Sequence, residues 1–232
     1  MAAFRAALEV GADAIELDVR LSRDGVPMVH HNWYTDEAAT PPVPIYSLTA
    51  LQLRREKVTD PRVELSRRHP IPTLEEVLKE FAGKIWLEIE MKGPEPEAAS
   101  RVASAVGEFR GAWSRMEVTS FHPTLLTVIH ELCPGIATAF LFPMSESWMR
   151  LDVVAYAALH GARLSKADAV HLSPNQLSEE VVATIRSGGV EVHAHAVNDE
   201  PAMTLAMRLG VPWICSDAAK EALAFRGRPT RS

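Results

Sequence analysis

One stretch decides the fold of this chain: Ala14-Ile15-Glu16-Leu17-Asp18-Val19. It is apolar apart from two carboxylates that are two residues apart. Residues i and i+2 of a strand point to the same face, so Glu16 and Asp18 would lie side by side. Two carboxylates on one buried face repel each other unless a positive charge lies between them, and a hard divalent cation prefers such oxygen ligands. The stretch therefore predicts a strand that carries part of a metal site.

A second stretch has the same pattern: Trp86-Leu87-Glu88-Ile89-Glu90-Met91-Lys92. In a strand, Glu88, Glu90 and Lys92 would share one face. Glu88 lies nearer the start of this strand, so we expect it to be an ion-pair partner with a structural role. The two stretches together predict a pair of strands whose polar faces meet.

Composition limits the classes of protein that this chain can belong to. It has 232 residues, 47% of them hydrophobic, and no Gly/Ser linker, which predicts a single domain over residues 1–232 with a frayed tail at 226–232. The net charge of −6 and the lack of a basic stripe exclude nucleic acid as the main partner. No apolar run is long enough for a transmembrane segment. Cys133 and Cys215 lack metal-ligand spacing, which predicts buried thiols in a reducing, cytoplasmic location.

Strand-like and helix-like patterns alternate along the chain, which is typical of a parallel α/β sheet. Short apolar runs predict seven strands, at Ala14–Leu21, Ile85–Met91, Met116–Phe121, Ala137–Phe142, Ala169–Leu172, Val190–Val197 and Trp213–Ser216. Capping residues and stop signals predict helices at Met1–Val10, from Thr73 through Lys79, from His122 to Pro134, from Ser178 to Gly188, from Asn198 to Gly210 and after Asp217. Polar, proline-bearing loops are expected at Thr35–Pro44 and Thr59–Pro72.

Polar residues at the strand ends favour a closed barrel over a Rossmann-type sheet. A Rossmann sheet usually has a glycine-rich turn after its first strand, and none is present. A TIM barrel places functional groups at the carboxyl ends of several strands. Such residues here are Asp18, Glu90, Ser120, Asn198 and Asp217. The first predicted helix has no N-cap, so we expect a TIM barrel that lacks its first strand, with an open slot between Ala14–Leu21 and Trp213–Ser216.

Several short motifs occur in a fixed order over nearly the whole chain. They are Gly11-Ala12-Asp13, Ile15–Val19, Asp24-Gly25, His31-Asn32, Ile71–Leu78, Ile89–Lys92, Ser120-Phe121, Val197-Asn198 and Ile214–Asp217. In this order the chain resembles the glycerophosphodiester phosphodiesterase family, which has a TIM-barrel fold. Each motif alone is weak, but the ordered set is specific.

The resemblance implies an enzyme of lipid metabolism, a phosphoric diester hydrolase acting on a small-molecule phosphodiester. It would hydrolyse glycerophosphodiesters to glycerol 3-phosphate and an alcohol. The resemblance also implies roles for residues: Glu16, Asp18 and Glu90 would bind a divalent metal, Mg²⁺ or Ca²⁺. His31 would be one of two acid/base histidines, and Lys92 would face the phosphate.

The chain also departs from the family pattern. The family begins with a strand carrying His-Arg-Gly, followed by Pro-Glu-Asn-Thr, and both are absent here. Asn32 replaces an aspartate, and His195 stands where a tryptophan is common. These departures leave two alternatives open. One is a catalytically impaired pseudoenzyme or binding module that retains the metal carboxylates. The other is a related lipid phosphodiesterase of the sphingomyelinase D or phosphoinositide phospholipase C type.

Each assigned residue has a simpler alternative. Glu16 and Asp18 could be strand-end carboxylates paired with Arg20 or Lys92, and Lys92 could form only a salt bridge to Glu90. His30 and His31 point to opposite faces, so only one of them can line the site, and the register favours His31. Of the remaining histidines, His193 and His195 are expected inside or at the rim of the barrel, and His171 is interpreted as a helix or loop residue with no partner signal.

Overall fold

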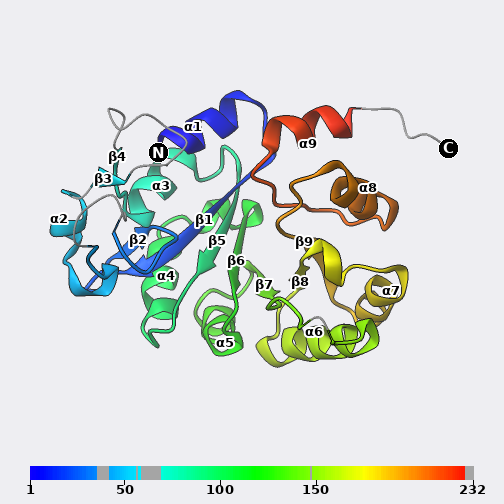
Figure 1. Ribbon diagram of the computed structural model, residues 1–232. Helices are drawn as coiled ribbons and strands as arrows, with labels where there is room; N and C mark the ends of the chain where they lie inside the picture. The colour runs from blue at the N-terminus through cyan, green and yellow to red at the C-terminus, as the bar shows by residue number, and fades with distance from the viewer. Residues whose placement is uncertain (36–41, 56, 59–68, 147, 228–232) are drawn as a thin grey trace.

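The computed structural model describes residues 1–35, 42–55, 57–58, 69–146 and 148–227, and its central feature is a curved seven-stranded sheet (Figure 1). The strand order is β2-β1-β5-β6-β7-β8-β9. From β1 to β9 all neighbouring strands are parallel, and β2 pairs with β1 in the antiparallel direction. The strands are β1 (Ala14–Leu21), β2 (Pro27–Val29), β5 (Trp86–Met91), β6 (Met116–Ser120), β7 (Ala137–Leu141), β8 (Ala169–Leu172) and β9 (Glu191–Ala194).

Helices follow one another around the outside of this sheet, as in a (β/α) barrel (Figure 1). They are α1 (Ala2–Glu9), α3 (Leu74–Phe81), α4 (Ala98–Gly107), α5 (Pro123–Leu132), α6 (Leu151–Ser165), α7 (Glu179–Ser187), α8 (Glu200–Arg208) and α9 (Ala219–Arg226). Smaller elements are α2 (Ala50–Leu53), a two-stranded sheet of β3 (Lys57–Val58) and β4 (His69–Pro70), and 3-10 turns at Ile45–Ser47, Arg110–Arg115 and Pro174–Gln176. Each described helix is too short or too polar to span a bilayer.

The helix starts follow from local capping chemistry. The Thr73 side chain accepts a hydrogen bond from the Glu76 backbone, while the Glu76 side chain bonds back to the Thr73 backbone, so the predicted capping box of α3 is confirmed. Ser178 and Asp199 cap α7 and α8 in the same way from one side. The first residues of α3, α7 and α8 are therefore set by local side-chain hydrogen bonds.

The two faces of the strands differ in chemistry. On β1, Ile15, Leu17 and Val19 are buried in the large hydrophobic core that also contains the apolar face of α3. Glu16 and Asp18 alternate with them and so face the inside of the barrel. The core therefore lies between the sheet and the helices, and it holds the interior carboxylates of β1 at fixed positions.

The segment predicted as the last strand, Trp213–Ser216, forms only an isolated bridge between Ala194 and Ile214. Its backbone lies along β9, with hydrogen bonds from Ala194 N to Trp213 O (3.0 Å) and from Cys215 N to Ala194 O (2.8 Å). The prediction of a regular strand is wrong here because the pairing is too short to form a ladder. The sequence also did not identify β2. The expected loops over 35–44 and 59–72 and the tail over 226–232 lie largely outside the described residues.

A cavity of about 680 Å³ lies between β1 and the 213–217 segment. Among the described residues, no backbone hydrogen bond joins these two segments. The rings of Trp86 and Trp213 stack at 5.3 Å beside the cavity, and Arg226 of α9 pairs with Asp13 just before β1. The cavity occupies the place where the sequence predicts an open slot.

A close approach at Gly161 gives a first test of the packing. A Cβ at Gly161 of α6 would overlap the ring of Phe140, which is 6% exposed. Such overpacking costs roughly 1–3 kcal/mol, more than the ~1 kcal/mol that alanine gains in a helix. We expect Gly161→Ala to lower the free energy of unfolding, as measured by urea denaturation. Gly107→Ala is the matched control, since nothing lies within 4 Å there, and it should raise stability by about 0.5–1 kcal/mol. Equal effects of both changes would contradict this packing.

Candidate active site

Two neighbouring parallel strands bring three carboxylates together. Glu16 is in register with Glu88, and Asp18 is in register with Glu90. One carboxylate oxygen from each of Glu16, Asp18 and Glu90 lies within 4.8 Å of the others. Glu90 is the last residue but one of β5, and Asp18 lies beside it, while Glu16 lies two residues earlier on β1. The carboxyl ends of the strands are where functional sites of TIM barrels are found. The structure thus brings together the three residues that the sequence selected.

The carboxylates carry an electrostatic penalty that a cation would relieve. Burial raises the pKa of Glu16 well above its usual value, and the charges of Asp18, Glu88 and Glu90 raise it further. Burial also raises the pKa of Glu90. A site made of carboxylate oxygens suits a hard cation such as Mg²⁺ or Ca²⁺. The donor set therefore fits the metal that the sequence implied.

Lys92 forms ion pairs with two of these carboxylates. Its Nζ lies 2.9 Å from Asp18 Oδ1 and 2.8 Å from Glu90 Oε1. Burial alone would lower the pKa of Lys92, but Asp18 and Glu90 outweigh it and raise the pKa. The salt bridge to Glu90 that the sequence left as an alternative is present, and Asp18 shares it. The ammonium lies beside the carboxylates, where it can also meet an anion.

His30 and His31 have different environments. The His30 side chain is buried, with Nε2 2.9 Å from the Tyr34 carbonyl oxygen, and burial lowers its pKa. The His31 side chain is exposed, with Nδ1 2.9 Å from Asn32 Oδ1. When Nδ1–H donates to this amide oxygen, Nε2 is left as the proton acceptor of the neutral ring. Burial raises the pKa of Glu90. The charge of Lys92 acts in the opposite direction, and His31 lies near enough to Glu90 to lower this pKa as well.

Arg20 bonds to backbone carbonyl groups and not to the carboxylates that the sequence analysis considers as its partners. Its Nε donates to the His31 carbonyl oxygen at 2.9 Å. A longer bond, 3.5 Å, joins Nη1 to the Gly93 carbonyl oxygen, and the guanidinium lies 4.0 Å from the centre of the Trp33 ring. Arg20 thus links the loop that carries His31 to the turn after β5.

The polar residues at later strand ends connect strands rather than join the carboxylates. Ser120 Oγ donates to the Met91 carbonyl oxygen at 2.8 Å. Asn198 Nδ2 donates to Asp217 Oδ2 at 2.9 Å, and the Asp217 backbone N–H donates to Asn198 Oδ1 at 2.8 Å. Ser120 thus connects β6 to β5, and Asn198 connects the end of β9 to the start of α9.

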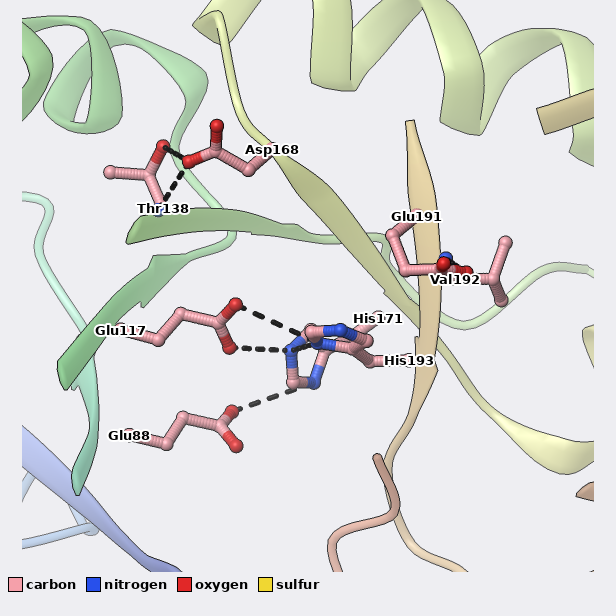
Figure 2. Close-up of polar contacts among 8 residues, drawn as sticks. All are labelled: Glu88, Glu117, Thr138, Asp168, His171, Glu191, Val192 and His193. Atoms are coloured by element: carbon pink, nitrogen blue, oxygen red, sulfur yellow. Dashed lines mark hydrogen bonds and ion pairs between the residues drawn. The ribbon is translucent and has the colours of Figure 1, made fainter. Parts of the chain in front are cut away.

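A second polar cluster lies deeper in the barrel, formed by Glu88, Glu117, His171 and His193 (Figure 2). His171 Nε2 lies 3.1 Å from Glu117 Oε2, and His171 Nδ1 lies 3.5 Å from Glu88 Oε1. The interpretation of His171 as a helix or loop residue is therefore wrong, because it lies on β8 and has buried partners. His193 lies inside the barrel as expected. The sequence did not identify Glu117, although an acidic residue inside the wholly buried strand β6 was a usable signal.

The charges of this cluster shift the pKa of Glu117 and of His171 in opposite directions. Burial alone would raise the pKa of Glu117, but the imidazoles of His171 and His193 lower it to about 2. Burial alone would lower the pKa of His171, but Glu88 and Glu117 raise it. His195 has no such partner among the described residues, and burial lowers its pKa to about 4. The interior thus holds one charged cluster next to a neutral imidazole.

Comparison with known proteins assigns this chain to a family of hydrolases. The model of the Glycerophosphoryl diester phosphodiesterase family matches residues 1–221. The chain belongs to this family. The resemblance inferred from the ordered motifs is therefore confirmed.

Curated relatives match over almost the full chain. The glycerophosphodiester phosphodiesterase of Bacillus altitudinis is 28% identical over 235 residues, covering 97% of this chain and 91% of the relative. The glycerophosphodiester phosphodiesterase of Caldanaerobacter subterraneus is 26% identical over 223 residues, covering 94% of this chain and 87% of the relative.

Solved structures share the fold. A phosphodiesterase of Oleispira antarctica, in complex with the product sn-glycerol-3-phosphate, superposes with a TM-score of 0.80 at 21% identity. That match covers 98% of this chain and 90% of the other chain. A glycerophosphodiester phosphodiesterase of Thermotoga maritima gives a TM-score of 0.72 at 24% identity, covering 97% and 90%. The predicted TIM-barrel class is therefore confirmed.

Proposed function

We propose that this protein hydrolyses glycerophosphodiesters to glycerol 3-phosphate and an alcohol in a reaction that needs a divalent metal. The observation that carries the proposal is the convergence of Glu16, Asp18 and Glu90 oxygens within 4.8 Å, in a member of this family. Relatives named as glycerophosphodiester phosphodiesterases support the substrate class. The retained family match over residues 1–221 makes the pseudoenzyme alternative less favoured.

The three carboxylates would hold the metal, Mg²⁺ or Ca²⁺. When bound, such an ion neutralises phosphate charge and polarises the phosphorus centre toward attack. Burial and the acidic neighbours raise the pKa of Glu16, which shows that the carboxylates repel one another. Without a cation, the folded protein would bear this repulsion, and a bound cation would relieve it.

The other residues orient the diester and move protons. Lys92 Nζ lies at the edge of the carboxylate group and would pair with a phosphate oxygen, favouring the charge that builds up in the transition state. His31 would exchange a proton at Nε2, either taking it from the attacking hydroxyl or giving it to the leaving alkoxide. Arg20 would act as a positioning residue, because it holds the backbone carbonyl of His31.

Hydrolysis of glycerophosphocholine tests the proposal. The purified protein should release glycerol 3-phosphate with Mg²⁺ or Ca²⁺ present, and a chelator should abolish the release. Asp18→Asn should reduce the metal-dependent rate by about 10²-fold or more, since an electrostatic contact at the reacting centre is worth that much. Asp152→Asn is the matched control, because Asp152 lies exposed in α6 and pairs with Arg150. Release that persists in chelator, or hydrolysis of sphingomyelin in its place, would contradict the proposal.

A further inference from the structure

The deeper cluster contains three side chains whose polar atoms face one another closely. His171 Nε2 lies 3.1 Å from Glu117 Oε2 and 3.1 Å from His193 Nδ1. His193 Nδ1 lies 3.6 Å from Glu117 Oε1. Figure 2 shows the carboxylate and the two rings converging from β6, β8 and β9. All three side chains are buried.

This cluster is distinct from the carboxylates of the candidate active site. Glu88 and Glu117 are in register with each other, while Glu90 is in register with Asp18 and Thr119. Two residues of strand, about 6–7 Å, separate Glu90 from Glu88 along β5. Glu16 is in register with Glu88, so it lies at the lower level, and the donor atoms distinguish the two groups better than the level does. The donor sets differ, because the deeper cluster offers two imidazole nitrogens and the carboxylate group offers oxygens alone.

The separations within the cluster match those of ligands around one ion. A tetrahedral site with metal–ligand distances of ~2.0–2.1 Å places its ligand atoms about 3.3–3.4 Å apart. Without an ion, His171 Nε2 must serve both a carboxylate oxygen and a second ring nitrogen, although one ring nitrogen offers a single hydrogen or a single lone pair. One cation would satisfy all three atoms at once.

A second observation concerns the other nitrogen of His171. His171 Nδ1 is buried and has no hydrogen-bond partner among the described residues, with Glu88 Oε1 just out of range at 3.5 Å. A metal-bound histidine usually donates its other N–H to a carboxylate, which orients the ring. Glu88 is the carboxylate placed to accept that hydrogen when Nε2 binds a metal. The orphaned nitrogen therefore has an assigned partner in the metal-bound state.

We propose that Glu117, His171 and His193 form a second metal site, for Zn²⁺ or a similar transition-metal ion. Imidazole nitrogens with one carboxylate favour zinc and its neighbours, whereas Mg²⁺ and Ca²⁺ prefer oxygen ligands. All three side chains also line the 680 Å³ cavity, which provides an entry path and leaves the fourth position open to water. The bound ion would join β6, β8 and β9 from inside the barrel.

Titration of the metal-free protein with Co²⁺ tests this proposal. Tetrahedral Co²⁺ absorbs visible light far more strongly than octahedral Co²⁺, so one equivalent should give an intense spectrum that Zn²⁺ abolishes. Glu117→Gln and His193→Gln should each weaken binding by more than 100-fold, and Glu88→Gln by about 10–100-fold, the usual effect of an outer partner. Asp18→Asn is the control that disables the oxygen-only site, and it should leave the spectrum unchanged.

X-ray absorption spectroscopy of the zinc-loaded wild-type protein keeps the test independent of variants that fail to fold. Two imidazole ligands and one carboxylate are expected. A zinc ion without imidazole ligands would overturn the proposal, as would a Co²⁺ spectrum that depends on Asp18 and not on His193. Absence of any Co²⁺ or Zn²⁺ binding would also overturn it. None of these readouts uses hydrolysis, so failure here leaves the proposed function separately testable.

Discussion

Replacement of His31 by alanine is expected to lower kcat for glycerophosphocholine by about 10²–10⁴-fold, the usual effect of removing a general acid or base. The reason is that the leaving alkoxide of choline is a poor leaving group and needs a proton. His31 is exposed, and its Nδ1 is bonded to Asn32, so Nε2 is the nitrogen that would carry the proton of the imidazolium form and give it to the alkoxide. Steady-state release of glycerol 3-phosphate at saturating metal measures the loss.

Two controls make the His31 result specific. His130→Ala removes an exposed histidine from α5, and it should leave the rate unchanged. A diester with p-nitrophenol as its leaving group needs little protonation, so His31→Ala should impair its hydrolysis much less. If His31→Ala retained most of its activity on glycerophosphocholine, the acid/base role would pass to His30 or to another residue.

Glu16→Gln is expected to have opposite effects on metal binding and on stability. Loss of one of three carboxylate ligands should weaken Mg²⁺ or Ca²⁺ binding by more than the ~10–100-fold that an outer partner contributes. The same change should stabilise the metal-free protein at neutral pH, because it removes one charge from a buried group of repelling carboxylates. Calorimetric titration measures the first effect, and thermal unfolding in chelator measures the second.

The pH dependence of this stabilisation has a definite sign. Burial, followed by the charges of Asp18, Glu88 and Glu90, raises the pKa of Glu16 in the folded state above its ordinary value of 4.5. The folded state then favours the protonated carboxyl, so the penalty is absent below pH ~4.5 and grows as the pH rises toward the folded pKa. Glutamine is neutral throughout, so its advantage should vanish in acid. A variant that is less stable at neutral pH would show that Glu16 already has a compensating partner.

Much of the carboxylate site could be predicted because its signals are local. Glu16 and Asp18 lie two residues apart on one strand, and Glu90 lies on a strand with the same pattern. Asp18 and Glu90 are distant in sequence, but both strands carry the same alternation of carboxylates, and parallel pairing of the two strands aligns these residues. The capping box at Thr73 is likewise complete within four residues. In each case the deciding interaction lies within one element or between two strands of matching pattern.

The deeper cluster could not be predicted in the same way. His171 and Glu117 are 54 residues apart, and neither has a partner close in sequence. Their contact depends on the curvature of the sheet, which turns the inner faces of β6 and β8 toward each other. The alternation of polar and apolar residues along a strand gives no information about that curvature. The same holds for Arg20, whose partners are backbone carbonyl groups at His31 and Gly93. Any residue can provide such a carbonyl, so the sequence carries no signal for it.

The stacked rings of Trp86 and Trp213 give the molecule an internal optical reporter. They are the only two indoles stacked on each other among the described rings, and both border the cavity beside β1. Transitions of two indoles this close couple to each other, so their circular dichroism depends on the angle between the rings. Whatever enters the cavity and separates the pair changes that coupling. Occupation of the barrel interior can therefore be followed without a label, by the light that the protein itself absorbs.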